Sequence, residues 1–151
     1  MLTTAADRLI AVLAADPGIT SQGFHDPRAN DYDQRRAQMF TLESVAEFER
    51  AMDFIATVPR RKTPDRKYSV DDWRFPARRF HRNRAGIYAR YATTVDSYLD
   101  DLGVCCISRG AMLAACVASG LLLRFDRYSG QFHTNLSAKA WESIMDRNRP
   151  P

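Results

Sequence analysis

The sequence predicts a mostly helical α+β protein with one C-terminal β-hairpin and a winged-helix-like C-terminal half. Apolar residues recur at helical spacing in several segments, and a Ser or Thr that can cap a helix precedes each of them. Near the C-terminus, two short segments of alternating character flank a four-residue turn. The 151 residues, of which 45% are hydrophobic, have the size and composition of a single domain over residues 1–151.

Residues 1–58 form the expected helical N-terminal part. Thr3 or Thr4 can cap a first helix with its apolar residues on one face, and Pro17-Gly18 ends it. The segment 19–32 is rich in turn-forming residues and shows no periodicity, which predicts an irregular connection.

A second helix is expected to start after Thr41 and to end at Val58-Pro59, because the residue before a proline is disfavoured in the helical region. Its apolar residues recur on one face, at Val45, Phe48, Met52 and Ile55. Charged residues occupy the other positions.

Positive charge is concentrated in the predicted basic arm, residues 59–92. Residues 57–92 contain eleven Arg or Lys against three Asp, a net charge of +8, while residues 1–56 carry five against nine and residues 93–151 six against six. Prolines and a glycine divide the arm into pieces, with a short helix expected over Val70–Phe75 after a Ser69 cap. Its six aromatic residues indicate that part of the arm packs on the core.

Residues 93–151 are expected to form a helix–helix–hairpin–helix part. A helix capped by Thr93 or Thr94 should end at Gly103, and Ser108 should cap the apolar helix RGAMLAACVASG. LLLRFD and QFHTNL flank the turn RYSG and predict the hairpin. Ser137 then caps the last helix, AKAWESIMDR.

Clustered Arg and Lys can neutralise phosphates, and interleaved aromatic residues can stack on bases or cover the core. The arm is therefore the leading nucleic-acid-binding candidate, with Trp73 expected either to stack or to pack. The helix after Ser108 is too apolar to read base edges, so a winged-helix-like fold would place contacts on the hairpin instead. The candidate residues are Arg60, Arg61, Lys62, Arg66, Lys67, Trp73, Arg78, Arg79, Arg82, Arg84, Arg124 and Arg127.

The sequence also permits other functions, for the arm and for residues outside it. The arm could contact an acidic protein surface or be a solvated face. A ribonuclease-like set would use His81, Arg82, Arg84 and Tyr88. A cysteine nucleophile would combine Cys105 or Cys106 with His133 as base and Asp126 or Asn135 as orienting group.

The sequence predicts no metal site and no cofactor. The three His residues are far apart, and Cys105-Cys106 lacks the spacing of a zinc or redox motif. No apolar stretch has the 18 or more residues of a membrane span, and the N-terminus lacks a basic leader. Cysteines in odd number, two of them adjacent, are typical of reduced thiols, so we expect a cytoplasmic location and no membrane partner.

Two stretches carry a resemblance to a known group of proteins. They are FIATVPRRKTPDRKYS and, after an intervening segment, SYLDDLGVCCISRGAMLAACVASGLLLRF with FHTNLSAKA. Together they resemble small uncharacterised proteins of proteobacterial plasmids and integrative elements, over about half of the chain. That group has a Ser-Asn-Gly-Ala-like helix cap and an Asn-Ile-Ser-like strand end. Here the cap is Ser108-Arg109-Gly110-Ala111, with Arg109 replacing the amide, and the strand end is Thr134-Asn135-Leu136-Ser137.

The resemblance implies a mobile-element origin and carries over no catalytic residue. Combined with the basic arm, it leads us to expect a non-enzymatic nucleic-acid-binding accessory or regulatory protein of a mobile genetic element. The alternative is a protein-binding inhibitor of a host defence, such as a CRISPR or restriction complex, or of a transfer complex. A small ribonuclease-like enzyme is the third hypothesis.

Overall fold

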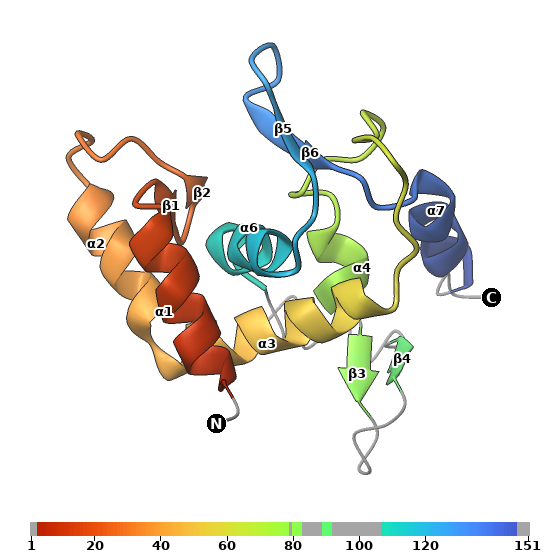
Figure 1. Cartoon of the computed structure of the whole chain (residues 1–151), viewed down its shortest axis with the longest axis horizontal. Coiled ribbons are helices and arrows are strands. Elements are labelled where there is room, and N and C mark those ends of the chain that lie inside the picture. Colours follow the sequence, from red (N-terminus) through yellow and green to blue (C-terminus); the bar gives the residue numbers. More distant parts are fainter. Residues whose placement is uncertain (1–2, 79, 83–88, 92–106, 148–151) are drawn as a thin grey trace.

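The computed structural model describes residues 3–78, 80–82, 89–91 and 107–147. Within them, helices surround one central helix and a hairpin projects from the helical layer (Figure 1). The helices are α1 (Ala5–Ala15), α2 (Tyr32–Ala37), α3 (Leu42–Ala56), α4 (Arg74–Arg78), α6 (Arg109–Ala118) and α7 (Ala138–Arg147), with a 3-10 turn η1 (Gln38–Phe40). Strands pair antiparallel as β1 (Ile19–Thr20) with β2 (Gly23–Phe24), β3 (Phe80–Arg82) with β4 (Ala89–Tyr91), and β5 (Leu123–Asp126) with β6 (Gln131–Thr134).

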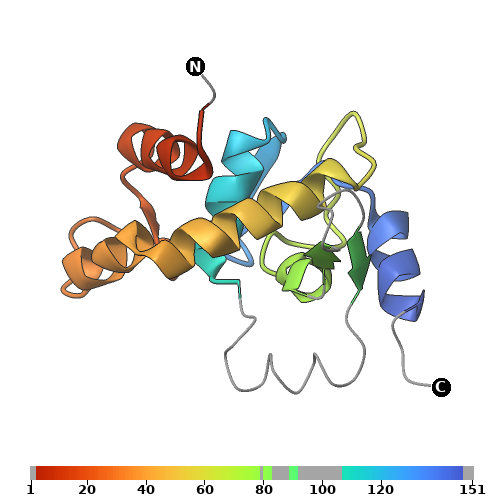
Figure 2. The same ribbon diagram turned by 90° about the horizontal axis from the view of Figure 1, so that it is seen from below.

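Helix α6 is central because small residues allow its neighbours to approach from several sides. It packs on α3, on α1 and on the β1–β2 pair. Figure 2 shows α3 running along the length of the molecule, with α1 near one end and α7 near the other. The predicted burial of α6 is confirmed, since every residue from Gly110 to Cys116 is buried.

Local capping sets the starts of three predicted helices. Thr4 forms a capping box with Asp7, accepting its N–H and donating its own N–H to the carboxylate. Thr41 accepts the N–H of Ser44, and Ser108 accepts that of Ala111. These side chains satisfy donors that the first helical turn leaves unpaired, so the predicted starts of α1, α3 and α6 are confirmed.

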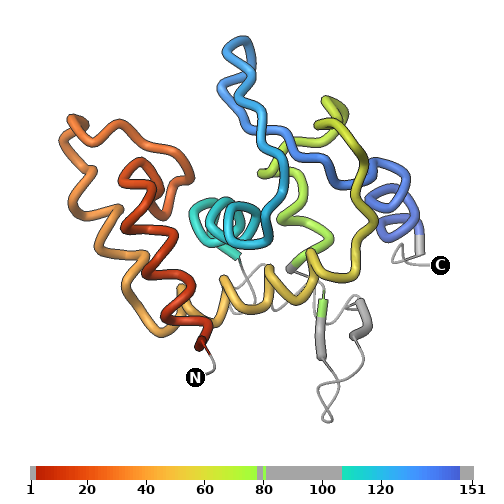
Figure 3. The backbone as a smooth tube through the Cα atoms, viewed as in Figure 1, coloured from red at the N-terminus to blue at the C-terminus, as the bar shows by residue number. Residues whose placement is uncertain are grey.

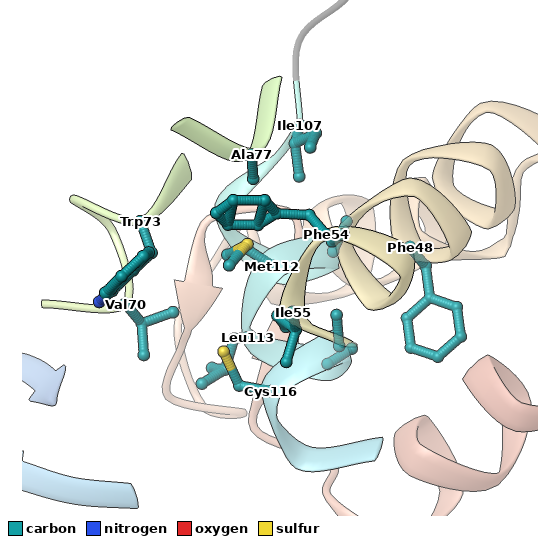
Figure 4. Close-up of a cluster of buried hydrophobic side chains, with 14 of the residues drawn as sticks. Phe48, Phe54, Ile55, Val70, Trp73, Ala77, Ile107, Met112, Leu113 and Cys116 are labelled. Carbon is teal, nitrogen blue, oxygen red and sulfur yellow. The ribbon is translucent and has the colours of Figure 1, made fainter. Parts of the chain in front are cut away.

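The core lies between α3 and α6 and extends to the turn before α4. Phe54 and Ile55 of α3 lie beside Met112 and Leu113 of α6, while the ring of Phe48 points away from them (Figure 4). Trp73 closes one side, with its ring centroid 6.1 Å from that of Phe54. The second helix was expected to bury Val45 and Met52 as well, and both are half-buried against this cluster.

Several elements differ from the sequence-based expectations. Ser69 and Asp72 do form a reciprocal cap, but it closes a turn, and α4 begins only at Arg74 rather than covering 70–75. The segment 19–32 is not uniformly irregular, because it contains the β1–β2 pair and the start of α2. The C-terminal hairpin and the last helix are confirmed, while the β3–β4 pair was not predicted. The expected helix at 93–102 lies outside the described residues.

Candidate functional site

The first part of the predicted arm, residues 59–69, is here called the basic loop. Its main chain is hydrogen-bonded to the segment that leaves β6. Ser137 N–H donates to Pro59 O at 2.9 Å, Arg61 N–H to Asn135 O at 2.5 Å, and Asp65 N–H to Thr134 O at 2.8 Å. The loop therefore has a defined path along the surface without belonging to a helix or a sheet.

A buried side chain adds to this anchoring. The amide of Asn135 donates to Arg61 O at 2.8 Å and accepts the N–H of Leu122 at 3.0 Å. At the other end of the loop, Tyr68 stacks on Trp141 of α7 with ring centroids 4.1 Å apart. Lys67 and the Tyr68 hydroxyl both donate to the Glu142 carboxylate. The basic loop is thus attached to the hairpin at its start and to α7 at its end.

The cationic side chains of the basic loop are all exposed. Arg61 pairs with Asp65 at 3.1 Å, and Lys67 pairs with Glu142. Arg60, Lys62 and Arg66 form no ion pair with any residue of the described part of the chain. Within the described ranges, three exposed cations therefore have no compensating carboxylate.

The β5–β6 hairpin carries two further predicted contacts, Arg124 and Arg127, and both are exposed. At its tip, Tyr128 is 98% exposed. The turn is closed by Asp126, which accepts the Tyr128 N–H at 2.9 Å, and this bond is the main reason that the pKa of Asp126 lies below its usual value. Figure 3 shows the hairpin projecting from the helices, with the basic loop running beside its base.

A pocket of about 190 Å³ lies on the hairpin, between β2, α6 and the turn that follows the basic loop. Phe24, Phe125 and Phe132 contribute rings to it. The ring centroid of Phe132 is 5.8 Å from that of Phe24 and 5.1 Å from that of Phe125. Arg109, at the start of α6, lines the same pocket and pairs with Asp71 at 3.2 Å.

The predicted site residues divide into three groups. The loop and hairpin cations lie on neighbouring segments at the surface. Trp73 is 1% exposed, so of the two roles considered for it the structure shows packing, and its ring cannot stack on a base. Arg78 ends α4 and Arg82 ends β3, whereas Arg79 and Arg84 lie outside the described residues.

The two enzymatic hypotheses stay predictions, because neither full set of residues lies within the described part of the chain. Cys116 is buried, and this burial raises the pKa of its thiol to about 12. Nε2 of His133 lies 3.9 Å from Oδ2 of Asp126, one of the two proposed orienting groups, while the nitrogen and the oxygen of the Asn135 side-chain amide both bond to main-chain atoms. Cys105, Cys106, Arg84 and Tyr88 lie outside the described residues, and His81 is in β3.

Sequence reasoning did not find the aromatic pocket. Its residues come from four segments far apart in the chain, and none forms a motif with its neighbours. One signal was present, because Arg109 is one of the few polar residues of an otherwise apolar helix. Its partner Asp71 is 38 positions earlier in the sequence, so only the fold brings the two together.

No match was found in comparisons with protein-family models, with curated proteins or with solved structures. None of the helices in the described ranges is long and apolar enough to cross a membrane. Among those same residues, no group of three or more His, Cys, Asp or Glu side chains is placed to hold a metal ion.

Proposed function

We propose that the protein binds nucleic acid through the basic loop and the β5–β6 hairpin, without catalysing a reaction. The observation that carries this proposal is that Arg60, Lys62 and Arg66, on a loop with an anchored main chain, form no ion pair with any residue that the structure describes. Cations of this kind can release the counterions condensed on phosphates at little cost, because they have no carboxylate partner among the described residues to give up. Anchoring also lowers the entropy lost when the loop engages a ligand.

The order of α6 followed by β5 and β6 agrees with a winged-helix-like arrangement, in which a hairpin follows the recognition helix. In this protein α6 is the buried central helix, so it has little surface to present to a DNA groove. The β5–β6 hairpin, which takes the place of the wing, and the adjacent basic loop would then make the contacts. Such contacts are mainly to phosphates and select structure more than sequence, as suits an accessory or regulatory protein of a mobile genetic element.

Fluorescence anisotropy with a labelled duplex and a labelled single strand, between about 50 and 300 mM salt, tests this function. The variant Arg60→Gln/Lys62→Gln/Arg66→Gln should lower affinity and reduce the slope of log K against log salt by roughly 2 to 3, since each phosphate contact contributes about 0.7 to 0.9. Arg8→Gln/Arg28→Gln/Lys139→Gln is the matched control, because it removes three exposed cations outside the basic loop and hairpin. Absence of binding at about 50 mM salt would contradict the proposal.

A protein-binding inhibitor is the second candidate, and exposed apolar residues favour it. Leu42 is 86% exposed and Phe40 is 57% exposed, and both line an apolar groove of about 170 Å³ with α1 residues. Exposed apolar groups gathered on one face are typical of interaction sites. If Leu42→Ser abolishes the biological effect of the protein while nucleic-acid affinity is unchanged, this second function is favoured over the first.

A further inference from the structure

The pocket between β2, α6 and the hairpin has exposed aromatic rings, although most large apolar side chains of a folded protein are buried in its core. Phe24 is 56% exposed and Phe125 is 52% exposed, although both contact the half-buried Phe132. Phe125 and Phe132 are direct cross-strand partners, so the hairpin register holds these two rings together. Phe24 approaches Phe132 edge-on, at an interplanar angle of 66°. The three rings form a fixed wall that is open to solvent.

A cation is held at the edge of this wall. The guanidinium of Arg109 pairs with Asp71, and the same carboxylate oxygen accepts from Arg74 at 3.0 Å. Asp71 therefore shares its single negative charge between Arg74 and Arg109, and Glu47 also attracts Arg74. Arg109 is more than half exposed, so it can still donate to a ligand.

The amide side chains that line the pocket, and the pocket volume, further restrict which ligand can bind there. Gln22 and Gln131 line the pocket, and each amide can both donate and accept, as the edges of nucleobases do. A volume of about 190 Å³ is below the range of about 300 to 1,000 Å³ that is usual for sites holding drug-sized ligands. The pocket therefore fits one flat ring with polar edges and not an extended cofactor.

The pocket also continues into the proposed phosphate-binding surface. Val70, which lines it, directly follows the basic loop and donates its N–H to Phe132 O at 2.8 Å. Arg124 precedes Phe125 in β5, so its side chain points to the opposite face of the hairpin, while Arg127 follows that strand in the turn. The basic loop on one side and Arg127 on the other thus supply cations that can hold a polyanionic backbone near a pocket for a single ring.

We propose that this pocket takes one unstacked base of a single-stranded nucleic acid, while the basic loop and hairpin cations contact the adjoining phosphates. This inference rests on the proposed function and names the form of nucleic acid. Bases of a duplex are stacked and paired, so their faces cannot reach Phe24 or Phe125. Bases of a single strand can turn outward and stack on such rings at little cost.

The test compares a labelled 12-nucleotide oligothymidylate strand with a labelled 12-base-pair duplex. Phe24→Ala and Phe125→Ala should each weaken single-strand binding by roughly 5- to 150-fold, which corresponds to about 1 to 3 kcal/mol for one stacked base. Duplex affinity should stay within about twofold, and the salt slope should not change, because no cation is removed. Phe75→Ala is the matched control, since Phe75 is a comparably exposed phenylalanine outside both the pocket and the apolar groove of Leu42.

The possible failures can be told apart. If the wild-type protein binds neither probe at about 50 mM salt, the proposed function falls and this inference falls with it. If both probes bind and the loop variant loses both, but Phe24→Ala and Phe125→Ala bind the strand normally, only the pocket inference is overturned. An aromatic side chain of a protein partner would then be the better occupant. Equal losses for strand and duplex would also overturn it.

A folding control accompanies the two variants. Phe24→Leu and Phe125→Leu keep apolar area at these positions but remove the aromatic face. They should retain the wild-type circular dichroism spectrum and still lose single-strand affinity. Full affinity in these folded Leu variants would overturn the inference.

Discussion

Gly110 of α6 lies directly against the carbonyl group of Thr20 in β1. A Cβ atom added at Gly110 would overlap the Thr20 oxygen and would stand 2.7 Å from the sulfur of Met39. The absence of a side chain at this position is what allows the central helix to pack against the β1–β2 pair.

Gly110→Ala should therefore lower the free energy of unfolding by about 3 kcal/mol or more, at the upper end of overpacking effects. In an unobstructed helix the same change would stabilise by roughly 0.5 to 1 kcal/mol, so the steric overlap decides the sign. Urea unfolding followed by circular dichroism measures it, with the exposed Val117→Ala in the same helix as control. A Gly110→Ala protein as stable as the wild type would show that this contact is looser than described.

Arg36 joins α2 to the end of α1. Its guanidinium donates to the carbonyl oxygens of Leu13, Asp16 and Ile19, which end α1 and begin β1. We expect Arg36→Gln to lower the free energy of unfolding by about 2 to 3 kcal/mol, because charge-assisted hydrogen bonds are lost and carbonyl groups are left unpaired. Chemical denaturation provides the measurement. Arg28→Gln, at a 92% exposed side chain, should stay within about 0.5 kcal/mol of the wild type.

Asn135 should control the order of the basic loop. Asn135→Ala leaves Arg61 O and the Leu122 N–H without their partner, at an expected cost of about 1 to 3 kcal/mol. Trypsin should then cut after Arg60, Arg61 or Lys62 faster than in the wild type, as mass spectrometry would show. Thr63→Ala, an exposed change in the same loop, should leave the cleavage rate unaltered.

The contact between the basic loop and α7 should make stability depend on pH. Hydrogen bonds from Lys67 and then Tyr68 hold the pKa of Glu142 below its usual value, and the same carboxylate raises the pKa of Lys67. The carboxylate contribution is therefore complete above about pH 4.3 and is lost as pH falls through the lower folded-state pKa. The ammonium contribution is complete below about pH 10.4 and is lost as pH rises through the higher folded-state pKa.

The difference in Tm between wild type and Glu142→Gln should consequently be present from pH 6 to 8 and shrink below about pH 4. Thermal unfolding at several pH values tests this. Glu49→Gln serves as the control, because Glu49 is exposed and forms no ion pair within the described residues. A Tm difference that does not vary with pH would indicate that the Lys67–Glu142 pair does not persist in solution.

The elements that could be predicted are those whose determinants are local. Thr4, Thr41 and Ser108 cap helices through atoms three residues away, so the sequence alone predicts the starts of those helices. Helix α2 has no buried residue and was not predicted. Arg36 ties it to carbonyl groups 17 to 23 positions earlier, a contact that has no sequence pattern.

The candidate site was predictable to a similar extent. The concentration of cations in residues 59–69 follows from counting charges. Charge counting does not predict which of these cations pair with a carboxylate, because Lys67 is neutralised by Glu142, which is 75 positions away. Trp73 illustrates the same limit. A tryptophan suits both stacking on a base and packing in a core, so only the tertiary fold shows that this one is in the core.

The way in which the basic loop is held has an evolutionary consequence. Main-chain atoms and the side chain of Asn135 make the bonds at its start, and the side chains of Arg60, Lys62 and Arg66 make no ion pair with other described residues. Substitutions at these three positions are therefore expected to be nearly neutral for folding and to act directly on the proposed binding. Selection could then strengthen, weaken or redirect the proposed binding in single steps, while the scaffold beneath the loop stays the same.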